Sequence, residues 1–310
     1  MHYTGTIWRP PYEAGSLLIQ ATAGCTHHRC KFCTLYEELP FDFRASPLGE
    51  VEADLLEAQM ELRGVTEAQQ KLWGLRERPR VTRVFLVGAN PFALTFDRLC
   101  KIAELVRRYF PECRAIRCFS RVTDVGRKTD GQLRELAQMG YNGITIGAET
   151  GDDAALAFMN KGYNASDIVE QSKRLDAAGI RYCFTYLAGI HGAGRGEAGA
   201  SASAAIFNRT RPELIGSSML TVFPGSRLYQ EILSGNWREE TEREKLRELR
   251  TLAAGLTIPT TFATLGASNA VRTEGKLPEQ RETILSALDG ALAALSEKEL
   301  RRYREQLPHL

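Results

Sequence analysis

Residues 17–33 read LLIQATAGCTHHRCKFC and contain the two features on which the organisation of the chain depends. Residues 17–21 are a mainly apolar run bounded by glycines, which predicts a buried strand. Cys25, Cys30 and Cys33 follow on the loop directly after this run. Three thiolates so close together can converge on one soft metal centre. The loop is therefore the first candidate for a functional site.

The strand pattern of residues 17–21 recurs along the chain, with amphipathic, helix-like stretches between the repeats. Six alternations between residues 15 and 225 predict a parallel sheet with helices packed outside it. Six units fit an α/β fold of the incomplete (β/α)6 barrel type better than a closed eightfold barrel. In such folds the chemistry lies at the carboxyl ends of the strands. The further strands are predicted at residues 84–87, 115–119, 144–146, 182–187 and 214–222.

The chain is predicted to have three parts. Residues 1–14 form an N-terminal extension, residues 15–225 the core barrel, and residues 226–310 a mostly helical C-terminal extension. In the extension, charged amphipathic patterns predict helices at residues 237–256 and 279–305, and residues 257–278 between them are expected to be irregular.

Composition excludes several classes of protein. The 40 basic residues are nearly balanced by 38 acidic ones, and the net charge of +2 does not support nucleic-acid binding. No apolar run approaches the ~20 residues that a membrane span requires, and the first residues lack the pattern of a signal peptide. We therefore expect a cytoplasmic protein whose seven cysteines are reduced thiols or metal ligands.

The cysteine loop leaves three kinds of metal site open. A cubane [4Fe–4S] cluster held by three cysteines has one iron free for an exogenous ligand, which is what distinguishes it from an electron carrier. A structural zinc site would take four ligands, and His27 or His28 would complete it. A ferredoxin-like carrier would need a fourth cysteine ligand, and the candidates are Cys100, Cys113, Cys118 and Cys183. The alternative for each of these four cysteines is a small buried hydrophobic residue of the core.

The loop resembles the signature of the radical S-adenosylmethionine (radical SAM) superfamily, Cys-x3-Cys-x2-Cys with an aromatic residue before the last cysteine. Phe32 fills the aromatic position, while the first spacing is one residue longer, giving Cys-x4-Cys-x2-Cys. We interpret the longer spacing as a feature of an unassigned subfamily. The resemblance implies a [4Fe–4S] cluster, S-adenosylmethionine chelated at its open iron, and an external one-electron donor such as a flavodoxin or ferredoxin. It also implies reductive cleavage of S-adenosylmethionine to a 5′-deoxyadenosyl radical.

Two further segments match the same resemblance. Gly88, Ala89 and Asn90 follow the second predicted strand of the barrel, where radical SAM enzymes carry a Gly-Gly-Glu-like segment whose backbone holds the methionine amino group. A simple strand-ending turn is the alternative for this piece. Ser120 and Arg121 follow the third predicted strand. The resemblance implies that they face the ligand, with Arg121 pairing with its carboxylate. A solvent-exposed arginine is the alternative for Arg121.

The fourth predicted strand carries the most specific of these segments. Residues 143–151 read GITIGAETG and residues 159–162 read MNKG. They are similar to a pattern of the branch that includes coproporphyrinogen dehydrogenase, the tRNA methylthiotransferases and Elongator-type enzymes. The resemblance implies that Glu149 binds the ribose or the amino group, and that Lys161 binds the carboxylate. A helix cap is the alternative for Glu149. Gly189, at the end of the fifth strand, would allow close approach of adenine.

The substrate is expected to be a small molecule or cofactor precursor. RNA or protein modification is the alternative within the same superfamily, and a non-catalytic iron–sulfur or zinc module is the alternative of a different class. Several side chains are candidates for lining the open side of the barrel, although packing or surface positions remain equally open for each of them: His27, His28, Tyr36, Tyr186 and His191.

Overall fold

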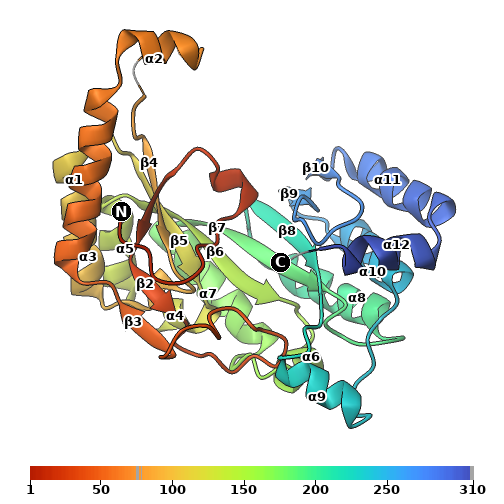
Figure 1. Ribbon diagram of the computed structural model, residues 1–310. Coiled ribbons are helices and arrows are strands. Elements are labelled where there is room, and N and C mark those ends of the chain that lie inside the picture. Colours follow the sequence, from red (N-terminus) through yellow and green to blue (C-terminus); the bar gives the residue numbers. More distant parts are fainter. Residues whose placement is uncertain (75–76, 78, 308–310) are drawn as a thin grey trace.

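A computed structural model describes residues 1–74, 77 and 79–307, and it is built around one eight-stranded sheet. The strands follow one another across the sheet in the order β1-β4-β5-β6-β7-β8-β9-β10 (Figure 1). The first six pair in parallel, which confirms the predicted α/β core. They are β1 (Leu17–Gln20), β4 (Arg83–Val87), β5 (Ala115–Ser120), β6 (Tyr141–Glu149), β7 (Arg181–Ala188) and β8 (Leu214–Met219).

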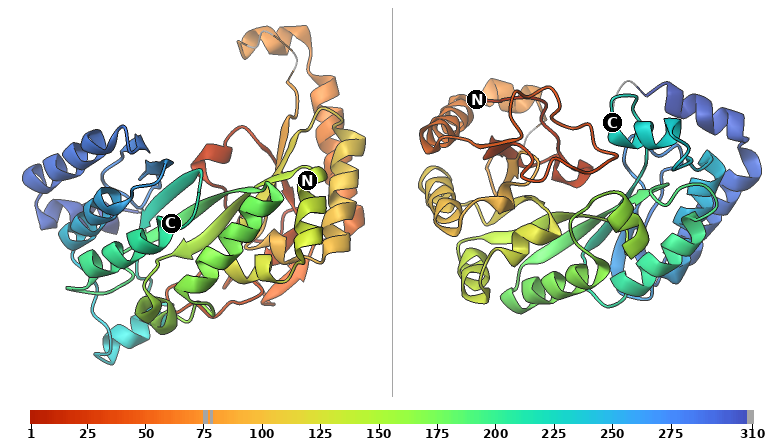
Figure 2. Two further views of the ribbon diagram at one scale, coloured as in Figure 1. Left: turned by 180° about the vertical axis from the view of Figure 1, so that it is seen from behind. Right: turned by 90° about the horizontal axis from the view of Figure 1, so that it is seen from below.

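Helices cover the convex face of this sheet, because each parallel connection needs a crossover that returns over the same face. Seen from below, they form an outer arc, and the N-terminal segment lies inside the arc on the concave face (Figure 2). The crossover helices are α3 (Phe96–Tyr109), α5 (Asp130–Gln138), α7 (Ala165–Ala178) and α8 (Gly196–Phe207). The first crossover, between β1 and β4, also contains α1 (Leu48–Gly64) and α2 (Glu67–Leu72).

The two faces of the central strands differ in burial. In β5, Ile116, Cys118 and Ser120 are buried, and the residues between them are only partly buried. The strand β8 alternates in the same way. Because successive side chains of a strand point to opposite faces, the concave face keeps room for cavities while the convex face is packed against helices.

Short elements surround the carboxyl edge of the sheet. The antiparallel pair β2 (Thr22–Gly24) and β3 (Phe43–Ala45) brackets the cysteine loop. The others are η2 (Pro91–Ala93), α4 (Val122–Gly126), α6 (Asp153–Phe158) and α9 (Arg227–Leu233). By contrast, η1 (Pro11–Glu13) precedes the amino end of β1, and Glu13 pairs with Arg83 at the start of β4.

The C-terminal extension continues the same sheet, which corrects the expectation that residues 257–278 are irregular. Strand β9 (Thr260–Ala263) pairs in parallel with β8, and β10 (Glu274–Leu277) pairs antiparallel with β9. Strands of four residues are too short for a periodic signal, and they are stable here because β8 supplies their partner edge. The division of the chain at residue 225 remains a prediction.

The rest of the extension is mainly helical. Besides α9, its helices are α10 (Glu242–Gly255), α11 (Arg281–Ala294) and α12 (Glu297–Glu305). The single helix expected at residues 279–305 is two helices, because Ser296 accepts a hydrogen bond from the backbone of Glu299 and starts a new helix. In the part of the chain that the structure describes, no helix combines the length and the apolar character needed to span a membrane.

Candidate active site

The cysteine loop is held in place by backbone hydrogen bonds on several sides. The amide of Cys25 donates to the carbonyl of Asp42 at 2.7 Å, next to the β2–β3 pair. The amide of Lys31 donates to the carbonyl of Met159 at 3.1 Å, and the carbonyl of Lys31 accepts from the amide of Leu228 at 2.7 Å. Segments far apart in the sequence thus hold the loop in place.

Cys25, Cys30 and Cys33 line one cavity of about 260 Å³. All three are free thiols and only partly buried as residues. Burial raises the pKa of Cys30 and raises that of Cys33 to about 12. Burial thus favours the protonated form of these two thiols, and assembly of a metal centre on them should release protons.

The spacing of these thiols fits a multi-iron cluster better than a single ion. A lone zinc ion holds its sulfur ligands at ~2.3 Å and so draws them within ~4 Å of one another. Among the described residues, no group of three candidate ligand atoms lying within 4.8 Å of one another includes these cysteines. A cubane binds each thiolate to a different iron and needs a wider arrangement.

The residues that would complete a zinc or ferredoxin-type site point elsewhere. The ring of His27 is 2.6 Å from the carbonyl oxygen of Asn160, and that of His28 is 2.9 Å from a carboxylate oxygen of Asp42. Neither histidine lines the cavity. The remaining cysteines do not line it either, and they lie on or next to the helices and strands of the core: Cys100, Cys113, Cys118 and Cys183.

Seven of the nine residues predicted to bind S-adenosylmethionine line the same cavity as the cysteines. Three of them are charged, namely Arg121, Glu149 and Lys161, and we call this group the charged floor of the cavity. The ammonium of Lys161 lies 3.3 Å from a carboxylate oxygen of Glu149 and 5.5 Å from the centre of the Phe32 ring. The seven are Phe32, Gly88, Ala89, Ser120, Arg121, Glu149 and Lys161.

Glu149 reaches the cavity through an unusual backbone conformation. Its φ is 63°, in the left-handed region, and the register of β6 against β7 shifts just before it. The second carboxylate oxygen accepts a hydrogen bond from the hydroxyl of Thr185 at 3.1 Å. A strained residue held by two partners is a recurrent feature of functional sites, and the helix-cap alternative finds no contact here, since Asp152 caps α6.

The floor of the cavity has an excess of positive charge. Burial disfavours the ammonium form of Lys161, but the acidic groups of Tyr163, Glu149 and Cys30 outweigh this effect and raise its pKa above the ordinary value. The guanidinium of Arg121 donates to the hydroxyl of Thr123 at 3.1 Å and to the carbonyl of Lys161. Two cations against the single carboxylate of Glu149 suit a ligand that carries its own carboxylate.

The other two predicted residues, Asn90 and Gly189, lie outside this cavity. The side chain of Asn90 is fully buried and donates to the hydroxyl of Thr26 at 2.7 Å and to the carboxylate of Asp124 at 2.9 Å. It therefore ties the cysteine loop to α4. The amide of Gly189 donates to Glu248 at 2.7 Å. The predicted contacts of both residues with S-adenosylmethionine remain predictions.

Several residues of the cavity were not predicted. Phe119, Gly147 and Thr185 lie at or near the carboxyl ends of β5, β6 and β7, and this position on neighbouring parallel strands would have indicated them. Trp8 comes from the N-terminal segment, and no local pattern indicates it. Among the five residues considered for the open side of the barrel, Tyr36 lines this cavity, and the other four do not.

A larger cavity of about 460 Å³ adjoins the first. Trp8, Phe119 and Thr185 line both, so the two spaces are neighbours. Residues 8–12 form one wall of the larger cavity, and β8 with the end of β9 forms another. The hydroxyl groups of Tyr12 and Thr145 are 2.7 Å apart, which anchors the N-terminal segment to β6.

The model of the radical SAM superfamily matches residues 19–202, more than half of the sequence, and the chain belongs to this superfamily. Enzymes of this family use a [4Fe–4S] cluster and S-adenosylmethionine, and the chain is one of them. The cysteines and the charged floor described above fit both groups. A search of curated proteins found no match.

Solved structures share the fold at low sequence identity. Coproporphyrinogen III oxidase from Escherichia coli, described as a radical SAM enzyme, is 14% identical with a TM-score of 0.53, over 77% of this chain and 51% of its own. The radical SAM methyltransferase TsrM from Kitasatospora setae, with cobalamin and a [4Fe–4S] cluster bound, is 16% identical with a TM-score of 0.53, over 71% and 37%. Methylornithine synthase is 15% identical with a TM-score of 0.52, over 79% and 64%. The chain thus spans less than two thirds of the length of these structures.

Proposed function

We propose that this chain holds a [4Fe–4S] cluster through Cys25, Cys30 and Cys33 and reductively cleaves S-adenosylmethionine to initiate a radical reaction on a small molecule. The observation that carries the proposal is the convergence of these three cysteines with seven further predicted residues on one cavity. When bound, the cluster supplies the electron that converts S-adenosylmethionine to methionine and a 5′-deoxyadenosyl radical.

The side chains of the cavity have complementary tasks. Lys161 and Arg121 bind the carboxylate of the methionine moiety, because they are the two cations of the floor. Glu149, held between Lys161 and Thr185, accepts hydrogen bonds from the ribose hydroxyls or the amino group. The ring of Phe32 covers the ammonium of Lys161 and limits its access to water.

The adjoining cavity of about 460 Å³ is the proposed substrate chamber. This volume lies within the ~300–1,000 Å³ of small-molecule sites. Its walls combine apolar side chains such as Phe184 and Leu214 with a few polar ones such as Thr145 and Glu274. A cavity of this volume favours a small molecule or cofactor precursor over an RNA or protein. The electron is expected from an external donor of the flavodoxin or ferredoxin type.

Anaerobic reconstitution tests the proposal directly. We expect iron and sulfide contents of one cubane per chain and a Mössbauer spectrum in which one iron changes on addition of S-adenosylmethionine. Reductant-dependent 5′-deoxyadenosine should form in the same sample. Four protein ligands to the cluster, or the absence of 5′-deoxyadenosine with a fully loaded cluster, would contradict it.

The substrate requires a separate experiment. Reduced enzyme and S-adenosylmethionine are supplied with a fractionated small-molecule extract, and 5′-deoxyadenosine formation is followed by mass spectrometry. A low-molecular-weight fraction that stimulates its formation supports the proposed chamber. Stimulation confined to the macromolecular fraction would support RNA or protein modification instead.

A further inference from the structure

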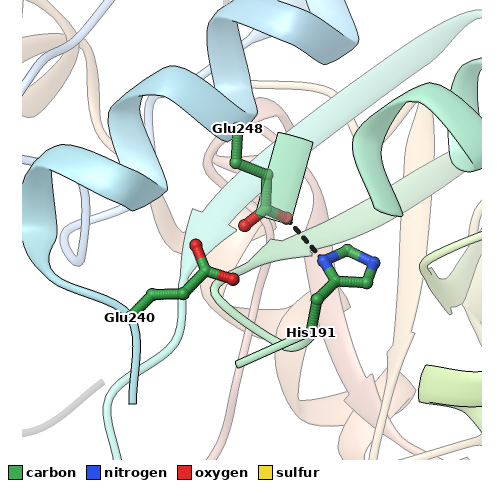
Figure 3. A group of neighbouring side chains, drawn as sticks. All are labelled: His191, Glu240 and Glu248. Atoms are coloured by element: carbon green, nitrogen blue, oxygen red, sulfur yellow. Dashed lines mark ion pairs between the residues drawn. The ribbon is translucent and has the colours of Figure 1, made fainter. Parts of the chain in front are cut away.

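A second cluster of ionisable side chains lies beyond the carboxyl end of β7, apart from the cysteine cavity. His191 follows β7, Glu240 precedes α10, and Glu248 lies on α10, and the three side chains converge (Figure 3). One potential ligand atom from each lies within 4.8 Å of the other two. At most 3% of each residue is exposed. Such a group of buried charges requires a compensating partner.

The hydrogen-bond network assigns the tautomer of His191. The hydroxyl of Ser203 donates to the carbonyl of Gly199 at 2.8 Å, so it accepts the hydrogen of Thr150, whose hydroxyl lies 2.9 Å away. The Thr150 oxygen is then left to accept from Nε2 of His191 at 2.8 Å. The neutral ring therefore carries its hydrogen on Nε2, and the lone pair of Nδ1 points toward the carboxylates.

The carboxylates also face the centre as acceptors. Oε1 of Glu248 accepts from the hydroxyl of Tyr186 at 2.6 Å, and it lies 3.1 Å from Nδ1 of His191. Its Oε2 accepts from the amide of Gly189. Neither carboxylate oxygen of Glu240 has a hydrogen-bond partner, although both are buried. Three acceptors thus meet without a donor among them.

The nearby lysine does not fill this role. The ammonium of Lys245 donates to the carbonyl of Leu220 at 2.9 Å, to Glu239 at 2.9 Å and to Glu242 at 3.1 Å. Its three hydrogens are therefore used by these three acceptors. The buried Glu240 therefore needs either a cation from outside the chain or a proton of its own.

We propose that His191, Glu240 and Glu248 bind a divalent transition-metal ion, with zinc as the preferred ion. One imidazole nitrogen and two carboxylates are a set of ligands that zinc takes in proteins. A neutral imidazole and two carboxylates also balance the charge of a divalent ion. The surrounding contacts agree, because a metal-bound histidine usually donates its other ring hydrogen to an acceptor such as Thr150, and the ligating carboxylate is itself hydrogen-bonded.

The small-residue helix α8 explains how the site is closed. A Cβ atom at Gly199 would lie 2.1 Å from Cδ2 of His191, and one at Gly196 would lie 2.5 Å from Oε2 of Glu240. Only glycine at these positions lets the helix backbone pack directly on the two ligands. The ion is therefore a structural one, which joins the end of β7 to α10 rather than meeting a substrate.

The competing arrangement is a pair of carboxyl groups that share a proton. Burial, together with the neighbouring charge of Glu248, raises the pKa of Glu240 to about 10. A protonated Glu240 would donate to Glu248 without any metal. The bound metal ion and the shared proton can be told apart by the metal content of the protein and by the effect of Glu240→Gln on that content.

The test uses the full chain in a form that cannot bind zinc at the cysteine loop. The Cys25→Ala/Cys30→Ala/Cys33→Ala variant is purified, exposed to zinc, gel-filtered and analysed by plasma mass spectrometry. We expect about one zinc per chain, a lower thermal midpoint in the presence of a chelator, and a zinc anomalous-diffraction peak between the three side chains. Adding Glu240→Gln should reduce bound zinc at least tenfold, and Glu197→Gln on the exposed side of α8 should not.

The result that overturns the proposal is equally definite. Failure of the triple-cysteine variant to retain zinc, manganese or cobalt, with no effect of chelator on its unfolding, would indicate the shared proton. This measurement stands even if Glu240→Gln impairs folding. It is also independent of the radical chemistry, which is judged from the iron content and 5′-deoxyadenosine of the wild-type enzyme.

Discussion

The two sites lie at the same edge of one sheet but differ in access. The cysteine cavity is open, its thiols are partly exposed, and it adjoins the larger chamber on the concave face. The His191 cluster is sealed between α8 and α10. An open site leaves coordination positions that an exogenous ligand can reach. In a buried site, the surrounding helices keep substrates away from the ligands.

Two consecutive residues of β7 separate the sites. Thr185 faces the cavity and donates to Glu149, and Tyr186 faces the helices and donates to Glu248. Because neighbouring side chains of a strand point to opposite faces, a single strand contributes to an open site on the concave face and to a closed one on the convex face. The access of exogenous ligands to a site therefore depends on which face of the sheet the site occupies, and not on which strand contributes to it.

The largest effect is expected from Cys30→Ala, which removes one ligand of the open site. Cluster binding and S-adenosylmethionine cleavage should both fall to background, a loss of at least ~1000-fold. Cys100→Ala, on α3, is the matched control and should leave both unchanged. Iron content and 5′-deoxyadenosine are the measurements. A Cys30→Ala enzyme that cleaves S-adenosylmethionine at the wild-type rate would refute the assignment of the loop.

Lys161→Met tests the charged floor of the open site. The substitution removes the ammonium that pairs with Glu149, and the carboxylate keeps only its hydrogen bond from Thr185. We expect kcat/KM for S-adenosylmethionine cleavage to fall ~100-fold, about 2.7 kcal/mol, mainly through KM. Lys161→Arg should recover part of the loss, and the exposed Lys173→Met should have no effect. If Lys161→Met bound S-adenosylmethionine as tightly as the wild type, the role of Lys161 would be structural.

Gly199→Ala tests how tightly the closed site is packed. The added methyl group would overlap His191, which has no room to move, and we expect a loss of ~2 kcal/mol in the free energy of unfolding. Gly290→Ala on α11 is the matched control, because nothing lies within 4 Å of its added Cβ. This control should gain ~0.5–1 kcal/mol from helix propensity. Urea titration measures the free energy of unfolding of both variants. A Gly199→Ala variant as stable as the wild type would mean that α8 can shift away from the cluster.

The smallest effect concerns the support of the open site and depends on pH. The ammonium of Lys128 is buried against the carbonyl groups of Phe92 and Leu94, at 2.5 and 3.3 Å. Burial lowers the pKa of Lys128 to about 8. The unfolded chain therefore holds more protons than the folded one above pH 8, and stability rises with pH until the unfolded lysine titrates near ~10.4.

From pH 8 to pH 9 this contribution should add about 1 kcal/mol to the free energy of unfolding. Lys128→Met lacks the titrating group, so the difference between the two proteins should change by this amount over the interval. Unfolding curves at the two pH values give the measurement. Parallel pH dependences would show that Lys128 stays charged in the folded protein.

The sequence by itself determined the alternation of strands and helices, the parallel core and the cysteine loop. Each of these is written in neighbouring residues: an apolar run, a helical period, or thiols within one short loop. Glu149 and Lys161 were indicated by the resemblance to the superfamily, and they lie at the end of β6 and after α6. Local patterns of this kind predict both the element and the end of the sheet where it is used.

The tertiary structure alone decided which of these residues meet. It placed Trp8 in the wall of both cavities, gave Asn90 the task of holding the cysteine loop, and added β9 and β10 to the sheet. It also brought His191 next to Glu240 and Glu248. Residues about 50 positions apart in the chain share no periodic signal, because their contact depends on how α8 and α10 pack over β7.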